Sequence, residues 1–250
     1  ILRQSLSQKN GLKNMPKPWL GKTIGEIMIS ALITAAGSST RYGKNKMLEP
    51  VQGKPLIIRT LERFLACGEI DEIIVAARES DTETYAELTG ALGIVKVVIG
   101  GKHRIESLLN ALNASRGDIL ITHDGARPLV KPDLIRELIS CAKKTGAAMT
   151  AVNPTATVKL TANQSLRISG TLPRAKTWIA QTPQGYNREV LKQAMQKAVR
   201  EKYFVPTDDS EIVAHMTSHD IMIVPGDHSN IKVTHRSDIA IANELFEDCF

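Results

Sequence analysis

The sequence predicts an α/β protein with a mostly parallel, twisted sheet, helices on both faces of that sheet, and a protruding β-hairpin arm. Short apolar runs alternate along the chain with longer segments whose apolar residues recur at helical spacing. Strands that are separated by helices pair in parallel. The alternation breaks at about residues 155–178, where two short β-rich runs are joined by Thr-Ala-Asn-Gln-Ser. These observations define the fold class.

The first half of the chain carries the regular alternation. Apolar residues at helical spacing predict a helix over Leu56–Cys67, and Gly68 fits its C-terminal stop. The expected strands are Ala31–Thr34, Ile70–Ala77, Val95–Ile99, Ile119–Thr122 and Ala147–Val152. The expected helices are Leu56–Cys67, Ser80–Leu92, Arg104–Ser115 and Lys131–Lys144. Ligands bind such sheets outside the carboxyl ends of the strands.

The second half begins with the predicted arm. Its runs, Thr157–Leu160 and Leu166–Thr171, are too polar for a core, so we expect them to leave the domain and contact another subunit. The remaining elements are helices at Arg188–Arg200 and Asp208–Met216, a strand at Ile221–Val224, an extended segment at Ile231–Thr234 and a helix from Ser237.

Length and charge indicate one domain that does not bind nucleic acid. A chain of 250 residues with 42% hydrophobic content can bury one core. We expect residues 1–27 to be an extension and residues 28–250 to be the domain. The net charge is +6, but residues 1–25 hold five basic residues and no acid. The remaining chain is nearly balanced, and its 4% aromatic content is low for stacking on bases.

The cysteines indicate a reducing compartment. Cys67, Cys141 and Cys249 are far apart, which argues against a zinc site or a disulfide framework. The sequence also lacks an apolar run of about 18 residues and a secretory signal. We therefore expect a cytoplasmic protein without a membrane partner.

The stretch from Ser30 to Arg41 joins a buried strand to a turn of small residues. In Ala35-Ala36-Gly37, small side chains let backbone N–H groups approach a bulky anion. Arg41 and Lys46 follow, and each can hold a phosphate charge. The pattern is neither a P-loop nor a dinucleotide signature. It favours a triphosphate site, with an ordinary α/β turn as the alternative.

Two further loops follow predicted strands. Gly100 and Gly101 permit close backbone approach before a helix N-terminus that could meet an anion. After the next strand, Asp124 is well placed to hold Mg²⁺ against phosphate oxygens. The alternative is that Asp124 is a capping residue paired with Arg127. For His123 and Arg127, bracing the loop is the favoured interpretation.

Later motifs admit two interpretations each. Thr207-Asp208-Asp209 is first a helix N-cap with an acidic first turn, and a role in the functional site is the alternative. Lys232 lies between two apolar residues, so a solvated lysine explains it as well as a phosphate ligand does.

Taken together, the motifs resemble the 2-C-methyl-D-erythritol 4-phosphate cytidylyltransferases of the non-mevalonate isoprenoid pathway. The resemblance covers about residues 30–245 in family order. It is carried by Ala35-Ala36-Gly37 with Arg41, Asn45-Lys46-Met47, Gly100-Gly101 with Arg104 and Ser107, His123 to Pro128, Thr157 and Lys159, Arg174, Gln181 to Gln184, Thr207-Asp208, and Asn230 to Thr234. Lys102 stands where an acid is common in the family.

The resemblance implies a Rossmann-like nucleotidyltransferase that transfers a cytidylyl group from CTP to 2-C-methyl-D-erythritol 4-phosphate and releases pyrophosphate. It implies Mg²⁺ as cofactor and a homodimer formed through the arm. The implied CTP-binding residues are Ala35, Ala36, Gly37, Gly101, Arg104 and Ser107. The implied catalytic residues are Arg41, Lys46 and Lys232, and those that bind the acceptor are Asp124, Thr157, Arg174 and Lys232. Asp124 is also the implied metal ligand, with Asp227 as a candidate for a second.

Three alternatives remain open from the sequence. The nearest is a ribitol-5-phosphate cytidylyltransferase, which shares the fold and the CTP half. The others are a sugar-1-phosphate nucleotidyltransferase, which usually has a longer Gly-rich signature, and a module that binds CTP without turnover.

Overall fold

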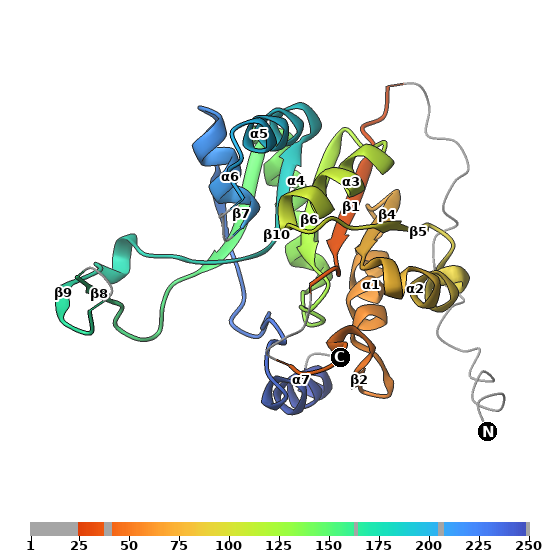
Figure 1. The fold of residues 1–250 in the computed structure, drawn as a ribbon, viewed down its shortest axis with the longest axis horizontal. Helices are drawn as coiled ribbons and strands as arrows, with labels where there is room; N and C mark the ends of the chain where they lie inside the picture. Colours follow the sequence, from red (N-terminus) through yellow and green to blue (C-terminus); the bar gives the residue numbers. More distant parts are fainter. Residues whose placement is uncertain (1–24, 38–41, 163–164, 205–207, 249–250) are drawn as a thin grey trace.

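The computed structural model describes residues 25–37, 42–162, 165–204 and 208–248. These residues form a seven-stranded sheet with a long hairpin extending to one side (Figure 1). In spatial order the strands are β11 (Met222–Pro225), β7 (Ala147–Val152), β10 (Ile179–Asn187), β6 (Ile119–Asp124), β1 (Ile29–Thr34), β4 (Glu72–Ala77) and β5 (Val95–Ile99). Every pairing is parallel except the two made by β10. The predicted mostly parallel sheet is confirmed.

Helices cover both faces of the sheet, as expected. Alternate residues of a strand point to opposite faces, so Ala31 and Ile33 of β1 join one core, while Leu32 between them joins the other. The first core receives residues from α1 (Leu56–Cys67), α2 (Thr82–Thr89), α4 (Pro132–Thr145) and α7 (Ser237–Asp248). The second receives residues from α3 (Arg104–Ala114), α5 (Arg188–Arg200) and α6 (Asp209–Met216).

The centre of the sheet contains a topological switch point. From β1 the chain proceeds outward through β4 and β5, and it then returns to place β6 on the other side of β1. Thr34 and Asp124, the last residues of β1 and β6, are direct partners in the register. Because connections leave such a point in opposite directions, a crevice opens outside the carboxyl ends of these two strands.

The hairpin of β8 (Lys159–Thr161) and β9 (Ile168–Thr171) stands away from the body of the molecule (Figure 1). Its apolar side chains find no core: Leu160, Leu166 and Ile168 are 46%, 98% and 62% exposed. The predicted protruding arm is confirmed.

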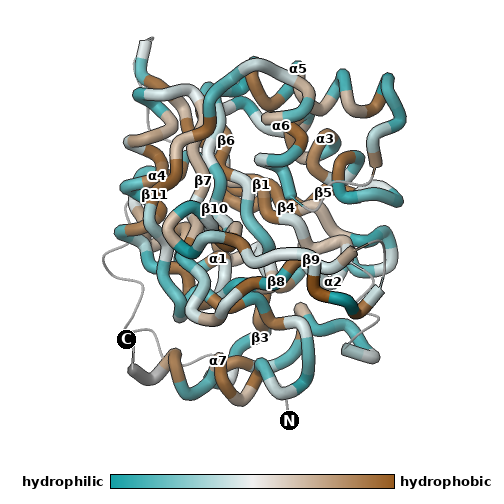
Figure 2. Tube along the Cα trace, turned by 90° about the vertical axis from the view of Figure 1, so that its left-hand side faces the viewer, coloured by the Kyte–Doolittle hydropathy of each residue, from teal (hydrophilic) through white to brown (hydrophobic). Residues whose placement is uncertain are grey.

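Short elements complete the described fold. They are the ribbon of β2 (Pro50–Val51) and β3 (Lys54–Pro55) and the 3₁₀ turns Lys46–Leu48, Glu79–Asp81, Gly90–Leu92 and Arg174–Lys176. Figures 1 and 2 place α5 and α6 at one end of the molecule and α7 at the other. In the part of the chain that the structure describes, no helix is long and apolar enough to cross a membrane.

One strand of the seven-stranded sheet, β10, was not expected from the sequence. β10 is central and antiparallel, yet its sequence Ile-Ala-Gln-Thr-Pro-Gln-Gly-Tyr-Asn has neither alternation nor an apolar run. A register shift between Ala180 and Gln184 accommodates the Thr182–Pro183 step. Inside the strand, Gln184 is fully buried because its Oε1 accepts hydrogen bonds from Ser210 N and Tyr186 OH. Long-range partners, rather than local propensity, make this segment a strand.

Other elements also differ from expectation. β6 continues through His123 and Asp124, which therefore end a strand instead of starting a loop. The predicted helix Ser80–Leu92 is an α-helix only over Thr82–Thr89, with 3₁₀ turns on either side. The segment at residues 231–234 is not a strand, so strand alternation does not set the direction of Lys232.

Candidate active site

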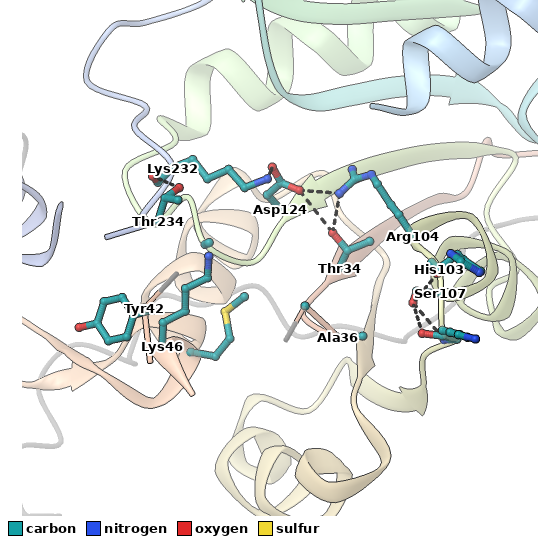
Figure 3. A pocket seen from close by; sticks show the side chains of 15 residues that line it. Thr34, Ala36, Tyr42, Lys46, His103, Arg104, Ser107, Asp124, Lys232 and Thr234 are labelled. Carbon is teal, nitrogen blue, oxygen red and sulfur yellow. Dashed lines mark hydrogen bonds and ion pairs between the residues drawn. The ribbon is translucent and has the colours of Figure 1, made fainter. Parts of the chain in front are cut away.

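A cleft of about 380 Å³ opens at the switch point, outside the ends of β1 and β6 (Figure 3). Most side chains around it are polar or basic. The cleft is lined by Thr34, Ala36, Gly37, Tyr42, Lys46, Met47, Gly101, Lys102, His103, Arg104, Ser107, Asp124, Ala126, Lys232 and Thr234. These residues come from separate stretches of sequence, which the parallel sheet brings to one edge.

The carboxylate of Asp124 is at the centre of the cleft. Arg104 Nη1 donates to Asp124 Oδ1 at 2.7 Å, and Lys232 Nζ lies 2.9 Å from Oδ2. Figure 3 shows these two cations reaching Asp124 from opposite sides. Arg127 Nε adds a longer contact to Oδ2 at 3.6 Å. One buried anion therefore holds three cationic side chains near the cleft.

These charges decide the protonation of Asp124. Burial favours the neutral carboxyl group, but Arg104, Lys232 and Arg127 outweigh it and hold the pKa of Asp124 well below its usual range. Burial likewise opposes the charge of Arg104, and the nearby carboxylates of Asp209 and Asp124 raise the pKa of that guanidinium. Both groups are therefore charged near neutral pH.

Arg104 is held from behind by a second carboxylate. Arg104 Nε and Nη2 donate to the two oxygens of Asp209 at 2.9 and 3.1 Å, a bidentate arrangement that fixes the guanidinium plane. Asp209 belongs to the first turn of α6, and its side chain is fully buried. Arg104 is at the first position of α3.

The small-residue turn and the glycine pair meet on another wall of the cleft. A Cβ atom on Gly100 would lie 2.7 Å from Ala36 Cβ and 2.9 Å from Ser107 Oγ, so only glycine fits there. Ser107 Oγ accepts a hydrogen bond from Gly101 N at 3.0 Å. Next to Gly37, by contrast, a Cβ atom would meet none of the described residues within 4 Å. The strand end and the glycine loop are thus packed together, with open space in front of Gly37.

Lys46 and Lys232 approach the cleft from segments that contact each other. Lys46 Nζ donates to the carbonyl oxygen of Val233 at 2.8 Å. The backbone N–H groups of Thr234 and His235 donate to Asp238 Oδ2 of α7. In this way α7 fixes the segment that carries one lysine and positions the other.

His123 and Arg127 brace the loop after β6, as expected. His123 is fully buried, with Nε2 3.1 Å from the carbonyl oxygen of Arg127 and Nδ1 3.0 Å from Thr182 Oγ1. Burial lowers the pKa of His123 to about 3, so its ring is neutral. Arg127 Nη1 donates to the carbonyl oxygen of Asn230 at 2.7 Å.

The cleft brings together most of the residues singled out from the sequence. Those on its walls are Ala36, Gly37, Lys46, Gly101, Arg104, Ser107, Asp124 and Lys232. Ala35 is instead a core residue, 2% exposed, whose N–H pairs with Ala76 of β4. Arg41 lies outside the described residues. Thr157 and Arg174 are exposed residues of the arm and are not among the residues that line the cleft of their own chain.

The described residues do not fit a magnesium ion held by protein carboxylates. Both oxygens of Asp124 already contact cations. Asp227 is paired with Lys131 at 2.6 Å and accepts hydrogen bonds from Ser229. Burial would raise the pKa of Asp227, but these partners lower it to about 2. Within the described ranges, no group of three His, Cys, Asp or Glu side chains could hold a metal.

Asp209 and Thr34 are functional candidates that were not among the site residues expected from the sequence. Thr34 accepts a hydrogen bond from Arg104 Nη1 at 3.3 Å, but in sequence it is only the last residue of an apolar strand. For Asp208, the N-cap interpretation is confirmed because its Oδ1 accepts from Glu211 N at 2.8 Å. Asp209 is its neighbour in the same motif, and no local signal distinguishes the two acids. A search of the sequence for an acidic partner of Arg104 could have identified Asp209.

The fold and the cleft define a nucleotidyltransferase of the α/β class, with a cationic site at the switch point of its sheet. The sequence profile of the 2-C-methyl-D-erythritol 4-phosphate cytidylyltransferases matches residues 29–248. The chain belongs to this family.

Similar proteins agree with the profile. Among relatives of that name, the protein from Solibacter usitatus is 34% identical over 231 residues, covering 86% of this chain and 94% of the relative. The protein from Dictyoglomus thermophilum is 35% identical over 217 residues, covering 84% and 93%. The crystal structure of 4-diphosphocytidyl-2C-methyl-D-erythritol synthase from Anaerococcus prevotii matches with a TM-score of 0.79 and 30% identity, covering 88% of this chain and 99% of that one.

The buried neutral ring of His123 makes stability depend on pH. The unfolded chain binds a proton at this side chain below about pH 6.5, whereas the folded chain does not until about pH 3. The contribution of His123 to the free energy of unfolding is therefore complete above pH 6.5. It is lost as the pH falls below that value, by up to about 1.4 kcal/mol per pH unit. We expect His123→Gln to lose this component of the slope between pH 6.5 and 5. Urea unfolding of both proteins at several pH values measures it, and equal slopes would contradict a neutral His123.

Proposed function

We propose that this chain transfers a cytidylyl group from CTP to 2-C-methyl-D-erythritol 4-phosphate, releasing pyrophosphate and forming 4-diphosphocytidyl-2-C-methyl-D-erythritol. Family membership over residues 29–248 supports this reaction. The observation that carries it furthest is the cleft itself, where Lys46, Arg104 and Lys232 converge on the ends of two parallel strands. A site of this charge suits two phosphorylated substrates.

In the proposed reaction, a phosphate oxygen of the acceptor attacks the α-phosphorus of CTP. A new P–O bond forms there, the bond from the α-phosphorus to the bridging oxygen breaks, and pyrophosphate leaves with that electron pair. The acceptor phosphate is already an anion near pH 7, so no general base is needed. What the protein contributes is the positioning of two mutually repelling anions and compensation of the charge that develops.

We assign roles to the chain's residues accordingly. Ala36 and Gly37 offer an open backbone edge to the phosphates, and Gly101, Arg104 and Ser107 form the wall for the base and ribose. Lys46 and Lys232, with Arg41, compensate the charge at the α-phosphorus. Asp124 orients Lys232 through their 2.9 Å contact and lies beside the acceptor. We propose Mg²⁺ as cofactor, carried by the triphosphate and not by a carboxylate site of the described residues.

The reaction is tested by pyrophosphate release. We expect release when the purified protein receives CTP, Mg²⁺ and 2-C-methyl-D-erythritol 4-phosphate, and little release with ribitol 5-phosphate or without an acceptor. Faster turnover of ribitol 5-phosphate would overturn the proposed acceptor. CTP binding with no release for any acceptor would identify a binding module instead of an enzyme.

Replacing Lys46 should reduce turnover without unfolding the protein. Lys46→Ala removes one cation that stabilises the transition state, and we expect kcat to fall by about 10²-fold or more. Lys44→Ala is the matched control, because Lys44 is exposed and pairs with Glu49 on the surface. Steady-state kinetics measure both variants, and near-wild-type kcat for Lys46→Ala would refute its role.

We also propose that two copies of the chain associate through the arm. A two-stranded ribbon is marginally stable alone in water, and this one exposes Leu160, Leu166 and Ile168. A second copy would cover these side chains. Thr157 and Arg174 lie on the same arm, and neither lines the cleft of its own chain. In the proposed dimer they bind the acceptor phosphate in the partner subunit's cleft.

Complementation between two inactive variants tests this arrangement. We expect Lys46→Ala and Arg174→Ala each to have low activity alone. In a mixed dimer, the arm of the Lys46→Ala chain would complete the cleft of the Arg174→Ala chain. Random pairing makes about half of the dimers mixed, each with one complete cleft of two, so activity should recover to roughly a quarter of wild type.

The mixture also tests the opposite assignment. If the arm served its own cleft, unfolding and refolding the two variants together would restore nothing. Sedimentation of the wild-type protein provides the independent measurement of association.

A further inference from the structure

Asp209 is buried more deeply than a residue in the acidic first turn of a helix needs to be. Its side chain is fully buried, and both oxygens are used by Arg104. The neighbouring Asp208 already caps α6, so capping does not account for Asp209. A buried carboxylate is costly unless it is paired, which means that this pair has to be made whenever α6 is docked.

The pair is the inner end of a chain of alternating charges. Asp209 binds one edge of the Arg104 guanidinium at 2.9 and 3.1 Å. The other edge, Nη1, donates to Asp124 Oδ1 at 2.7 Å. The second oxygen of Asp124 contacts Lys232 Nζ at 2.9 Å. This series of ion pairs thus begins at a fully buried carboxylate and ends at Lys232, whose side chain is 40% exposed at the cleft.

Each link restricts the next one. A bidentate contact fixes the plane of a guanidinium group, whereas a single contact leaves it free to rotate. Asp209 therefore sets the direction in which Nη1 points, and Nη1 sets the position of Asp124 Oδ1. Thr34 Oγ1 supports the same Nη1 at 3.3 Å. The α6 end is itself rigid, because Ser210 N donates to the buried Gln184 Oε1 of β10 at 3.0 Å.

We propose that Asp209 is a positioning residue for the transfer reaction, acting through Arg104 and Asp124 to fix the ammonium group of Lys232 at the cleft. Asp209 touches no substrate. The proposal rests on the proposed function for its kinetic consequence, but the placement of Lys232 is a property of the free protein. The simpler possibility is that Asp209 only pins α6 to α3.

Asp209→Asn is the central variant. The amide keeps the shape of the carboxylate, but its NH₂ group faces an N–H of Arg104, so one of the two contacts is lost and the charge is removed. We expect kcat to fall about 10-fold or more. Glu72→Gln is the matched control. Glu72 is a buried carboxylate that accepts from Ser30 Oγ at 2.6 Å, at the start of β4, the end remote from the cleft. We expect Glu72→Gln to have a lower free energy of unfolding but a kcat within about two-fold of wild type.

A double-variant cycle separates positioning from simple pinning. If Asp209 acts through Lys232, then Asp209→Asn combined with Lys232→Gln should be no slower than Lys232→Gln alone, within about two-fold. Independent roles would instead multiply the two losses, and that result would overturn the proposal.

A spectroscopic readout tests the placement of Lys232 without any turnover. Reductive methylation with carbon-13 formaldehyde labels each lysine and keeps its charge, and Lys232→Gln identifies the signal of Lys232. We expect this signal to move towards that of freely exposed lysines in Asp209→Asn and to stay unchanged in Glu72→Gln. An unchanged signal in folded Asp209→Asn would overturn the proposal.

Two further outcomes are decided by the same set of proteins. If the wild-type protein releases no pyrophosphate, the proposed function fails, while the lysine signal still decides the role of Asp209. If Asp209→Asn does not fold, Thr34→Val takes its place in the test. It removes one hydrogen-bond acceptor of Arg104 Nη1 at the cleft. A smaller shift of the Lys232 signal in the same direction would support the proposal, and no shift would overturn it.

Discussion

The ionised carboxylate of Asp124, buried at the end of β6, is the constraint on which the rest of the site depends. A buried anion requires nearby cations, and here Arg104, Lys232 and Arg127 come from the start of α3, the segment before α7 and the loop after β6. Because one anion orders these cations, they are in place before any substrate arrives. Preorganised charge of this kind stabilises a transition state more effectively than groups that must first reorient.

The cleft is also shaped by where side chains are small. Gly100 lets the loop after β5 pack against Ala36, and Gly37 leaves its backbone edge open. The site therefore combines open backbone on one wall with cations on the other. Its proposed chemistry needs neither a nucleophilic side chain nor a general base, because the acceptor phosphate is itself the nucleophile. A cleft with open backbone on one wall and cations on the other suits a reaction whose main difficulty is bringing two anions together.

The arm exposes apolar side chains, and the cleft lacks the arm residues that we propose bind the acceptor. In the proposed reaction, the cleft supplies groups for the nucleotide and the reacting phosphorus. The arm carries Thr157 and Arg174 on a hairpin whose Leu160, Leu166 and Ile168 are exposed. A second copy of the chain would meet both needs at once. The helix α7 has a different role within one chain. Its Asp238 orders the segment that carries Lys232, and the Val233 carbonyl oxygen in that segment accepts a hydrogen bond from Lys46.

By itself, the sequence determined the alternation of strands and helices, the protruding arm, and the presence of Gly37, Gly101 and Asp124 at or just after strand ends, because spacing and small residues act within a few positions. The tertiary structure alone decided that polar β10 is a central strand, that Ala35 belongs to the core, and that Asp209 holds Arg104. The last two residues are 105 positions apart. Burial and ion pairing over such separations depend on which surfaces the folded chain brings together, and no local pattern records that.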